Sequence, residues 1–139
     1  MTVQDPDVVA TSGAESAAAE SPRAGQLGLA ARTAAEGVTV LAVSGEIDML
    51  TAPQLRAGAL QHLDAGSALV LDLSGVSFLG SAGLAVLVEA SQHAKRRGAA
   101  FRVVAVERAV TRPLAATGLG EVFSVFESVD QALEADESR

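Results

Sequence analysis

Residues 71–84 read LDLSGVSFLGSAGL. They lead from an apolar run at 69–73, typical of a buried strand, to a helical pattern that begins at Leu84. The glycines and serines between the two have the composition of a loop. Because a loop between a buried strand and a helix can carry chemistry, this segment is the first candidate for a functional site.

The sequence that follows predicts a helix and a second strand. The helix is expected to stop at Gly98, and residues 101–106 then form another buried strand. The apolar face of this helix consists of Leu84, Leu87, Val88 and Ser91.

A helix is also predicted ahead of the stretch, over residues 51–64. The Thr51 hydroxyl is expected to cap it, Gln54 to complete a capping box, and Pro53 fits its first turn. Its apolar stripe consists of Ala52, Leu55, Ala59 and Leu63.

The remaining segments complete the predicted fold. Residues 27–33 and 38–44 are expected to pair as a hairpin. A third helix is expected over 109–117, an edge strand over 122–125 and a last helix over 130–135. Three strands separated by two helices imply right-handed crossovers, so the fold class is α/β, a mixed, mainly parallel β-sheet packed against helices.

Length and charge predict one domain with an arm. The chain has 139 residues and a net charge of −7. Residues 1–25, rich in Ala and Ser and acidic, lack Leu, Ile and Phe, and are expected to be a disordered N-terminal arm because they bury too little apolar surface. The domain is placed at 26–135 and a tail at 136–139. Residues 26–126 carry eight acids and eight bases, so the acidity lies mainly at the ends.

Composition disfavours several classes of function. With no Cys and two His, neither a metal centre nor another cofactor is expected. The apolar runs are much shorter than the roughly 18 residues of a membrane span, which predicts a soluble cytoplasmic protein. An acidic chain without Trp or Tyr is a poor nucleic-acid binder.

Motifs of known enzymes fail at residues 71–84. A phosphate-binding loop would need Lys at position 81, which is Ser, and a nucleophile elbow would need Gly at position 79, which is Leu. His62 and His93 are expected on exposed helix flanks, so a catalytic triad is unsupported and the chain is not expected to be an enzyme.

Ser81 itself has two interpretations. As a helix N-cap it would accept a hydrogen bond from a first-turn amide, which is the interpretation that physical chemistry alone favours. The alternative is a phosphorylation site, because a helix N-terminus accommodates negative charge.

Three motifs in order resemble the STAS domains of bacterial anti-sigma factor antagonists. Residues 44–48, SGEID, look like that family's Gly-Glu-Leu-Asp element. Residues 71–84 resemble its strand and its Asp-Ser-Ser/Thr-Gly-Leu loop, and Thr117-Gly118-Leu119 resembles a later turn. The resemblance covers roughly residues 27 to 134.

The resemblance implies a regulator of transcription that acts by partner switching, without catalysis. In the family, the unphosphorylated antagonist captures an anti-sigma factor with an ATP-binding serine kinase domain, which frees the sigma factor. Phosphorylation reverses this. The family's phosphoacceptor falls on Ser81.

The resemblance also implies a partner-binding surface around this loop. The expected partner-binding residues are Asp48, Leu79, Gly80, Ala82, Gly83 and Leu84. For Asp48, a purely structural role as a turn or capping carboxylate is the competing interpretation. The oligomeric state is left open between a monomer and a weak dimer.

Two departures from the family motif support an alternative function. Gly80 stands where the family has Asp, and Ala82 replaces its second hydroxyl residue. The alternative is a non-phosphorylated STAS subunit that docks on a transporter ATPase or a stress-sensing complex. A function in binding nucleotides or small ligands is disfavoured, because the sequence has no phosphate loop, aromatic clamp or basic pocket.

Overall fold

The computed structural model describes residues 25–137, which form one five-stranded sheet with helices. In chain order the elements are β2 (Gly28–Ala35), β3 (Val38–Ile47), α2 (Ala52–Asp64), β4 (Ala68–Leu79), α3 (Ser81–Arg97), β5 (Phe101–Val104), α4 (Arg108–Ala116), a 3-10 turn (Leu119–Glu121), β6 (Ser124–Phe126) and α5 (Val129–Glu137). The strand order is β2-β3-β4-β5-β6, with β2 antiparallel to β3 and the other pairs parallel. The predicted mixed, mainly parallel α/β fold is therefore confirmed.

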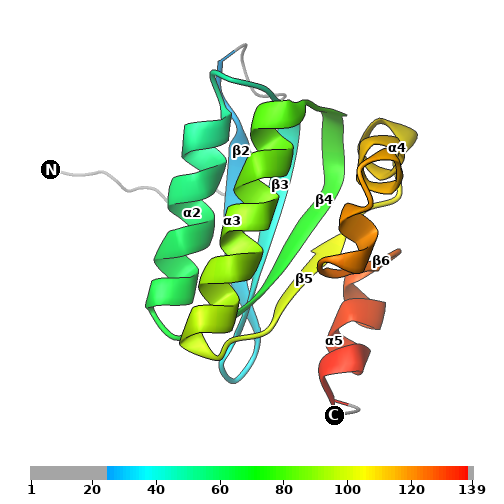
Figure 1. The fold of residues 1–139 in the computed structure, drawn as a ribbon. Coiled ribbons are helices and arrows are strands. Elements are labelled where there is room, and N and C mark those ends of the chain that lie inside the picture. Colours follow the sequence, from blue (N-terminus) through cyan, green and yellow to red (C-terminus); the bar gives the residue numbers. More distant parts are fainter. Residues whose placement is uncertain (1–24, 138–139) are drawn as a thin grey trace, which may run out of the picture.

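Helices cover the two faces of the sheet unequally. Figure 1 shows α2 and α3 side by side over the sheet, with α4 and α5 at its β5–β6 end. The larger core lies under α2, α3 and α4, and includes Leu71 of β4 and Leu87 of α3, both 0% exposed. A smaller cluster on the other face joins Val70 and Val104 to Ala132 of α5. The second face of β2 and β3 thus has less helical cover.

The helix α2 confirms its predicted stripe and contradicts its predicted cap. All four stripe residues are buried. Thr51 makes no side-chain capping bond. Its hydroxyl instead donates to the Glu46 carbonyl at 2.8 Å and accepts from the Asp48 amide at 2.9 Å. The predicted capping box was wrong because the end of β3 lies close enough to engage the hydroxyl, and Gln54 bonds the backbone of Gly25 and Leu27.

The strand β4 is the largest departure from expectation. It continues through the segment predicted as a loop and ends at Leu79. β3, which reaches Ile47 rather than residue 44, pairs with this second half in parallel, with register shifts near Gly75 and Phe78. These irregularities admit a Gly- and Ser-rich segment into the sheet, so only Gly80 separates strand from helix.

The other boundaries moved by a few residues. The edge strand lies at Ser124–Phe126 instead of 122–125, and α5 continues to Glu137, beyond the predicted domain end at 135. Apart from Gly25, the predicted arm lies outside the described residues, as do residues 138–139 of the tail. Among residues 25–137, no helix combines the length and the apolar character that a membrane crossing requires.

Candidate functional site

The carboxyl ends of β3 and β4 bring the predicted site residues together. Ile47 lies in register with Leu79, and the Gly80 amide donates to the Ile47 carbonyl at 2.9 Å. Asp48 and Ser81 each follow this junction within two residues, although they are far apart in sequence. The junction lies at the upper end of the sheet in Figure 1.

Ser81 is the first residue of α3 and is exposed. The N-cap is Gly80, whose extended backbone (φ −93°, ψ −178°) accepts from the amides of Gly83 and Leu84. The predicted N-cap role of Ser81 was wrong by one position, because the strand runs on to Leu79 and the helix begins directly after Gly80. The hydroxyl of Ser81 therefore does not cap α3, and it lies at the positive end of the helix dipole.

Asp48 stabilises the turn between β3 and α2. Its Oδ1 accepts from the amides of Leu50 at 2.9 Å and Thr51 at 3.1 Å. These are the hydrogen bonds of a turn carboxylate, so the structural role of Asp48 explains the position and partners of this oxygen. The side chain stays half-buried beside the junction.

Leu79 and Gly83 are buried, which corrects their expected place on the partner-binding surface. Leu79 is 4% exposed. A Cβ on Gly83 would come within 2.5 Å of Ile47 Cγ2 and 2.6 Å of Leu79 Cδ1. Both residues therefore pack α3 against the ends of β3 and β4. The Leu79 side chain is buried and Gly83 has none, so neither presents a side chain at the surface.

Three exposed apolar residues surround the junction instead. Met49 is 81% exposed, Leu50 is 72% and Phe78 is 49%. The Phe78 ring lies beside Gly80, where its Cε2 would be 3.1 Å from an added Cβ. Large apolar side chains left exposed at one end of a sheet make that end a candidate binding surface.

We call this region the C-edge surface. It consists of Asp48, Met49, Leu50, Phe78, Gly80, Ser81, Ala82 and Leu84. Sequence reasoning missed Met49, Leu50 and Phe78. The signal for the first two was an apolar pair inside a polar turn, where no helix stripe or strand alternation requires one.

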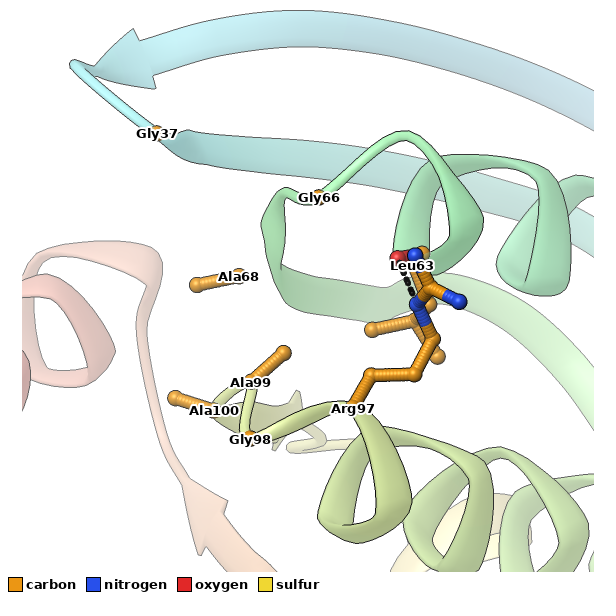
Figure 2. A pocket seen from close by; sticks show the side chains of 8 residues that line it. All are labelled: Gly37, Leu63, Gly66, Ala68, Arg97, Gly98, Ala99 and Ala100. Atoms are coloured by element: carbon orange, nitrogen blue, oxygen red, sulfur yellow. Dashed lines mark hydrogen bonds between the residues drawn. The ribbon is translucent and has the colours of Figure 1, made fainter.

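At the opposite end of the sheet, three turns surround a hollow of about 320 Å³. It is lined by Gly37, Leu63, Gly66, Ala68, Arg97, Gly98, Ala99 and Ala100, shown in Figure 2. Arg97 supplies the charge of this lining, and its guanidinium donates to the carbonyls of Leu63 at 3.1 Å and Asp64 at 3.0 Å. These bonds complete the end of α2, so Arg97 has a structural role here.

Near this hollow, an ion pair joins α2 to α3. His93 was expected to be exposed, but only 23% of its side chain is, and its Nε2 lies 2.7 Å from Asp64 Oδ1. The hydrogen bond from His93, with its charge and that of Arg97, lowers the pKa of Asp64 below its ordinary value. Within residues 25–137, no group of His, Asp and Glu side chains could hold a metal ion.

Comparison with known proteins identifies the family. The sequence model of the STAS domain family matches residues 30–132. The chain therefore belongs to the STAS domain family.

Its relatives include regulators from mycobacteria. The anti-sigma-F factor antagonist RsfB of Mycobacterium tuberculosis is 40% identical over 98 residues, which are 70% of this chain and 80% of that protein. The anti-sigma-F factor antagonist RsfA of the same species is 33% identical over 103 residues, covering 72% and 80%. The crystal structure of an anti-sigma factor antagonist from Mycobacterium paratuberculosis superposes with a TM-score of 0.75 at 37% identity, covering 82% of this chain and 97% of that one.

Proposed function

We propose that this chain is an anti-sigma factor antagonist. It binds an anti-sigma factor through the C-edge surface and so frees a sigma factor, which regulates transcription by partner switching. The role is one of binding, without catalysis by this chain, and its place is the cytoplasm. Two kinds of support meet here, the named relatives and the geometry of the C-edge surface.

One observation carries the proposal. An exposed serine that makes no helix cap lies at the same end of the sheet as three exposed apolar side chains, where buried residues pack α3 against β3 and β4. The apolar side chains supply area for a partner, as in the core of a protein–protein interface. The hydroxyl lies where an added charge would fall at the interface itself.

Phosphorylation of Ser81 by the anti-sigma factor's serine kinase domain is the proposed switch. A phosphate there adds about −1.5 to −2 charges. The first turn of α3 tolerates them because helix N-termini favour negative charge, so the domain stays folded. Burying the same charges against a partner without matched cations costs several kcal/mol, and even about 3 kcal/mol is over a hundredfold in affinity.

The alternative is a STAS subunit that docks on a transporter ATPase or in a stress-sensing complex without being phosphorylated. The observation in its favour is Gly80, which leaves no carboxylate beside Ser81, together with Ala82. In that case the C-edge surface is a permanent contact and Ser81 has no regulatory role.

The test uses the full chain as bait in the cytosol of its source organism, followed by mass spectrometry. Wild type is expected to retain a small anti-sigma factor with an ATP-binding kinase domain. With that partner purified, calorimetry is expected to give over a hundredfold weaker binding for Ser81→Asp and nearly unchanged binding for Ser81→Ala. Incubation with ATP is expected to place one phosphate on Ser81.

Ser124→Asp is the matched control, because Ser124 is an exposed serine on the edge strand β6, outside the C-edge surface. It is expected to bind as wild type does. Equal binding by Ser81→Asp, with its melting temperature unchanged, would contradict the switch. If wild type and Ser81→Asp, each used as bait, retain the same transporter ATPase, that result would favour the alternative.

A further inference from the structure

Phe78 is the most exposed aromatic side chain of this chain. The sequence has four Phe and neither Trp nor Tyr, and all four Phe lie within residues 25–137. Phe101 and Phe123 are buried and Phe126 is half-buried, whereas Phe78 is 49% exposed. Since aromatic side chains are enriched at protein–protein interfaces, Phe78 is a candidate contact residue.

An extra residue in β4 turns Phe78 outward. Val76 and Phe78 pair with two consecutive residues of β3, so Ser77 between them has no partner in that strand. In an unbroken strand, Phe78 would lie on the same face as Val76, which is 1% exposed. The irregularity instead places Leu79 in the core and leaves Phe78 at the surface. Bulges re-aim side chains in this way and are frequent beside functional sites.

Gly80 leaves room for the ring of Phe78. A Cβ at position 80 would lie 3.1 Å from Phe78 Cε2 and 3.5 Å from its Cζ. The first distance is so short that a side chain at position 80 would displace the ring by a few tenths of an ångström. The backbone of Gly80, with φ at −93°, is one that residues with side chains adopt freely. What the glycine provides is therefore space for the ring, on the residue that precedes Ser81.

We propose that Phe78 is the anchor through which the C-edge surface binds the anti-sigma factor, and that Gly80 positions its ring. This inference rests on the proposed function. The matching site on the partner is an apolar pocket that receives the ring beside Ser81. A few side chains that fill pockets at the centre of an interface carry most of its affinity, and aromatic residues are frequent among them.

The neighbours of Phe78 favour an apolar pocket. Met49 and Leu50, at the same end of the sheet, are 81% and 72% exposed, so a partner gains most there by burying apolar surface. Asp48 Oδ1 is engaged by amides of its own turn. Glu46, which pairs with Phe78 in the sheet, is exposed and places a carboxylate nearby. The mouth of the pocket is therefore expected to be free of acidic side chains.

The test measures the affinity of two variants and of their combination for the purified anti-sigma factor, by calorimetry. Phe78→Ala is expected to bind about thirtyfold more weakly than wild type. Gly80→Ser adds a Cβ and keeps a residue that suits a helix N-cap, so α3 is expected to stay stable. It is expected to weaken binding about fivefold when residue 78 is Phe and less than about twofold when residue 78 is Ala.

Two control variants lie outside the C-edge surface. Val122→Ala shortens an apolar side chain that is 41% exposed, and Gly120→Ser adds a Cβ where nothing lies within 4 Å. Both are expected to bind as wild type does. Proton NMR of the free protein reports the ring position directly. Gly80→Ser is expected to shift the ring signals of Phe78, which are identified by their absence from Phe78→Ala.

Each outcome separates this inference from the proposed function. Equal binding by Phe78→Ala and wild type would overturn the inference, and so would an effect of Gly80→Ser that is the same with Phe or Ala at position 78. If the melting temperature shows that Phe78→Ala does not fold, unchanged affinity of Gly80→Ser overturns it. In all three cases the proposed function stands. A wild-type chain that binds no anti-sigma factor would overturn the proposed function, and this inference with it.

Discussion

The two ends of the sheet are built from similar connections and present different surfaces. At the C-edge surface, Met49 and Leu50 in the turn after β3, Phe78 near the end of β4 and Ser81 at the start of α3 are all exposed. At the opposite end, the turns close with glycines at positive φ, Gly37 and Gly66 among them, and with backbone hydrogen bonds.

The contrast shows that a hollow and a binding surface need not coincide. The hollow at the opposite end, shown in Figure 2, is lined mostly by small residues and by an arginine that bonds the end of α2. The C-edge surface has exposed apolar side chains and an exposed serine. A protein partner needs exposed area more than a cavity, so the proposed partner contact is placed at the C-edge surface and not at the hollow.

The prediction with the largest expected effect disrupts the buried packing beneath the C-edge surface, where Gly83 contacts Ile47 and Leu79. Gly83→Ala places a methyl group within 2.5 Å of Ile47 Cγ2, where both packed neighbours are buried. The free energy of unfolding is expected to fall by about 1–3 kcal/mol, as overpacking does elsewhere. Urea denaturation followed by circular dichroism measures it.

Gly120→Ala is the control for Gly83→Ala, because nothing lies within 4 Å of a Cβ on Gly120. Its midpoint in urea is expected to stay near that of wild type. A Gly83→Ala protein as stable as wild type would mean that α3 can shift away from β3, and that the C-edge surface has no rigid base.

The second prediction separates binding from stability at the C-edge surface. Leu50 is 72% exposed, so Leu50→Ala removes little from the folded core and the melting temperature is expected to stay unchanged. Affinity for the anti-sigma factor is expected to fall about tenfold, which is about 1.4 kcal/mol. Calorimetry measures it, with Val122→Ala, 41% exposed on the turn before β6, as the apolar control. A loss that is the same in both variants would remove Leu50 from the interface.

The smallest expected effect is a pH dependence at the opposite end. Since His93 lowers the pKa of Asp64 in the folded chain, the unfolded chain binds the proton more readily. The stabilisation is therefore present above the ordinary Asp pKa of about 3.9 and is lost as the pH falls through the lower folded value. Asp64→Asn removes the titration.

Thermal melts between about pH 6 and about pH 2 measure this effect. The advantage of wild type over Asp64→Asn is expected to shrink as the solution becomes acidic, while partner binding at neutral pH stays equal. Glu121→Gln, at an exposed carboxylate on the 3-10 turn, serves as control. An advantage that is constant over the whole range would show that the pair does not contribute through its charge.

Local patterns in the sequence were enough for the elements and their order. The apolar spacing that includes Leu55 and Leu63 predicted the buried face of α2, and Gly98 marked the end of α3 at φ +70°. Such features depend on residues within one or two helical turns, which a sequence displays directly. The motif resemblance then predicted Ser81 and Asp48 for one site, and the Ile47–Leu79 pair of β3 and β4 puts both residues at the same end of the sheet.

What local patterns could not predict depends on partners distant in the chain. The second half of β4 is Gly- and Ser-rich and becomes a strand only because β3 extends alongside it. The Thr51 hydroxyl bonds the Glu46 carbonyl, which is only five residues away in the chain, because β3 continues to Ile47 and does not end at residue 44. The burial of Gly83 follows from contact with Ile47, which no spacing within α3 reveals.

The single residue between β4 and α3 has a consequence for any enzyme that modifies Ser81. Because Gly80 is the only connecting residue, the backbone around Ser81 cannot move away from the domain while α3 stays intact. Binding of this segment in a cleft as an extended peptide would unwind the first turn of α3 and break the hydrogen bond from the Gly80 amide to the Ile47 carbonyl. Such an enzyme must therefore recognise the intact domain as its substrate. A synthetic peptide with the sequence of residues 76–86 would carry the same serine and lack the shape by which it is presented.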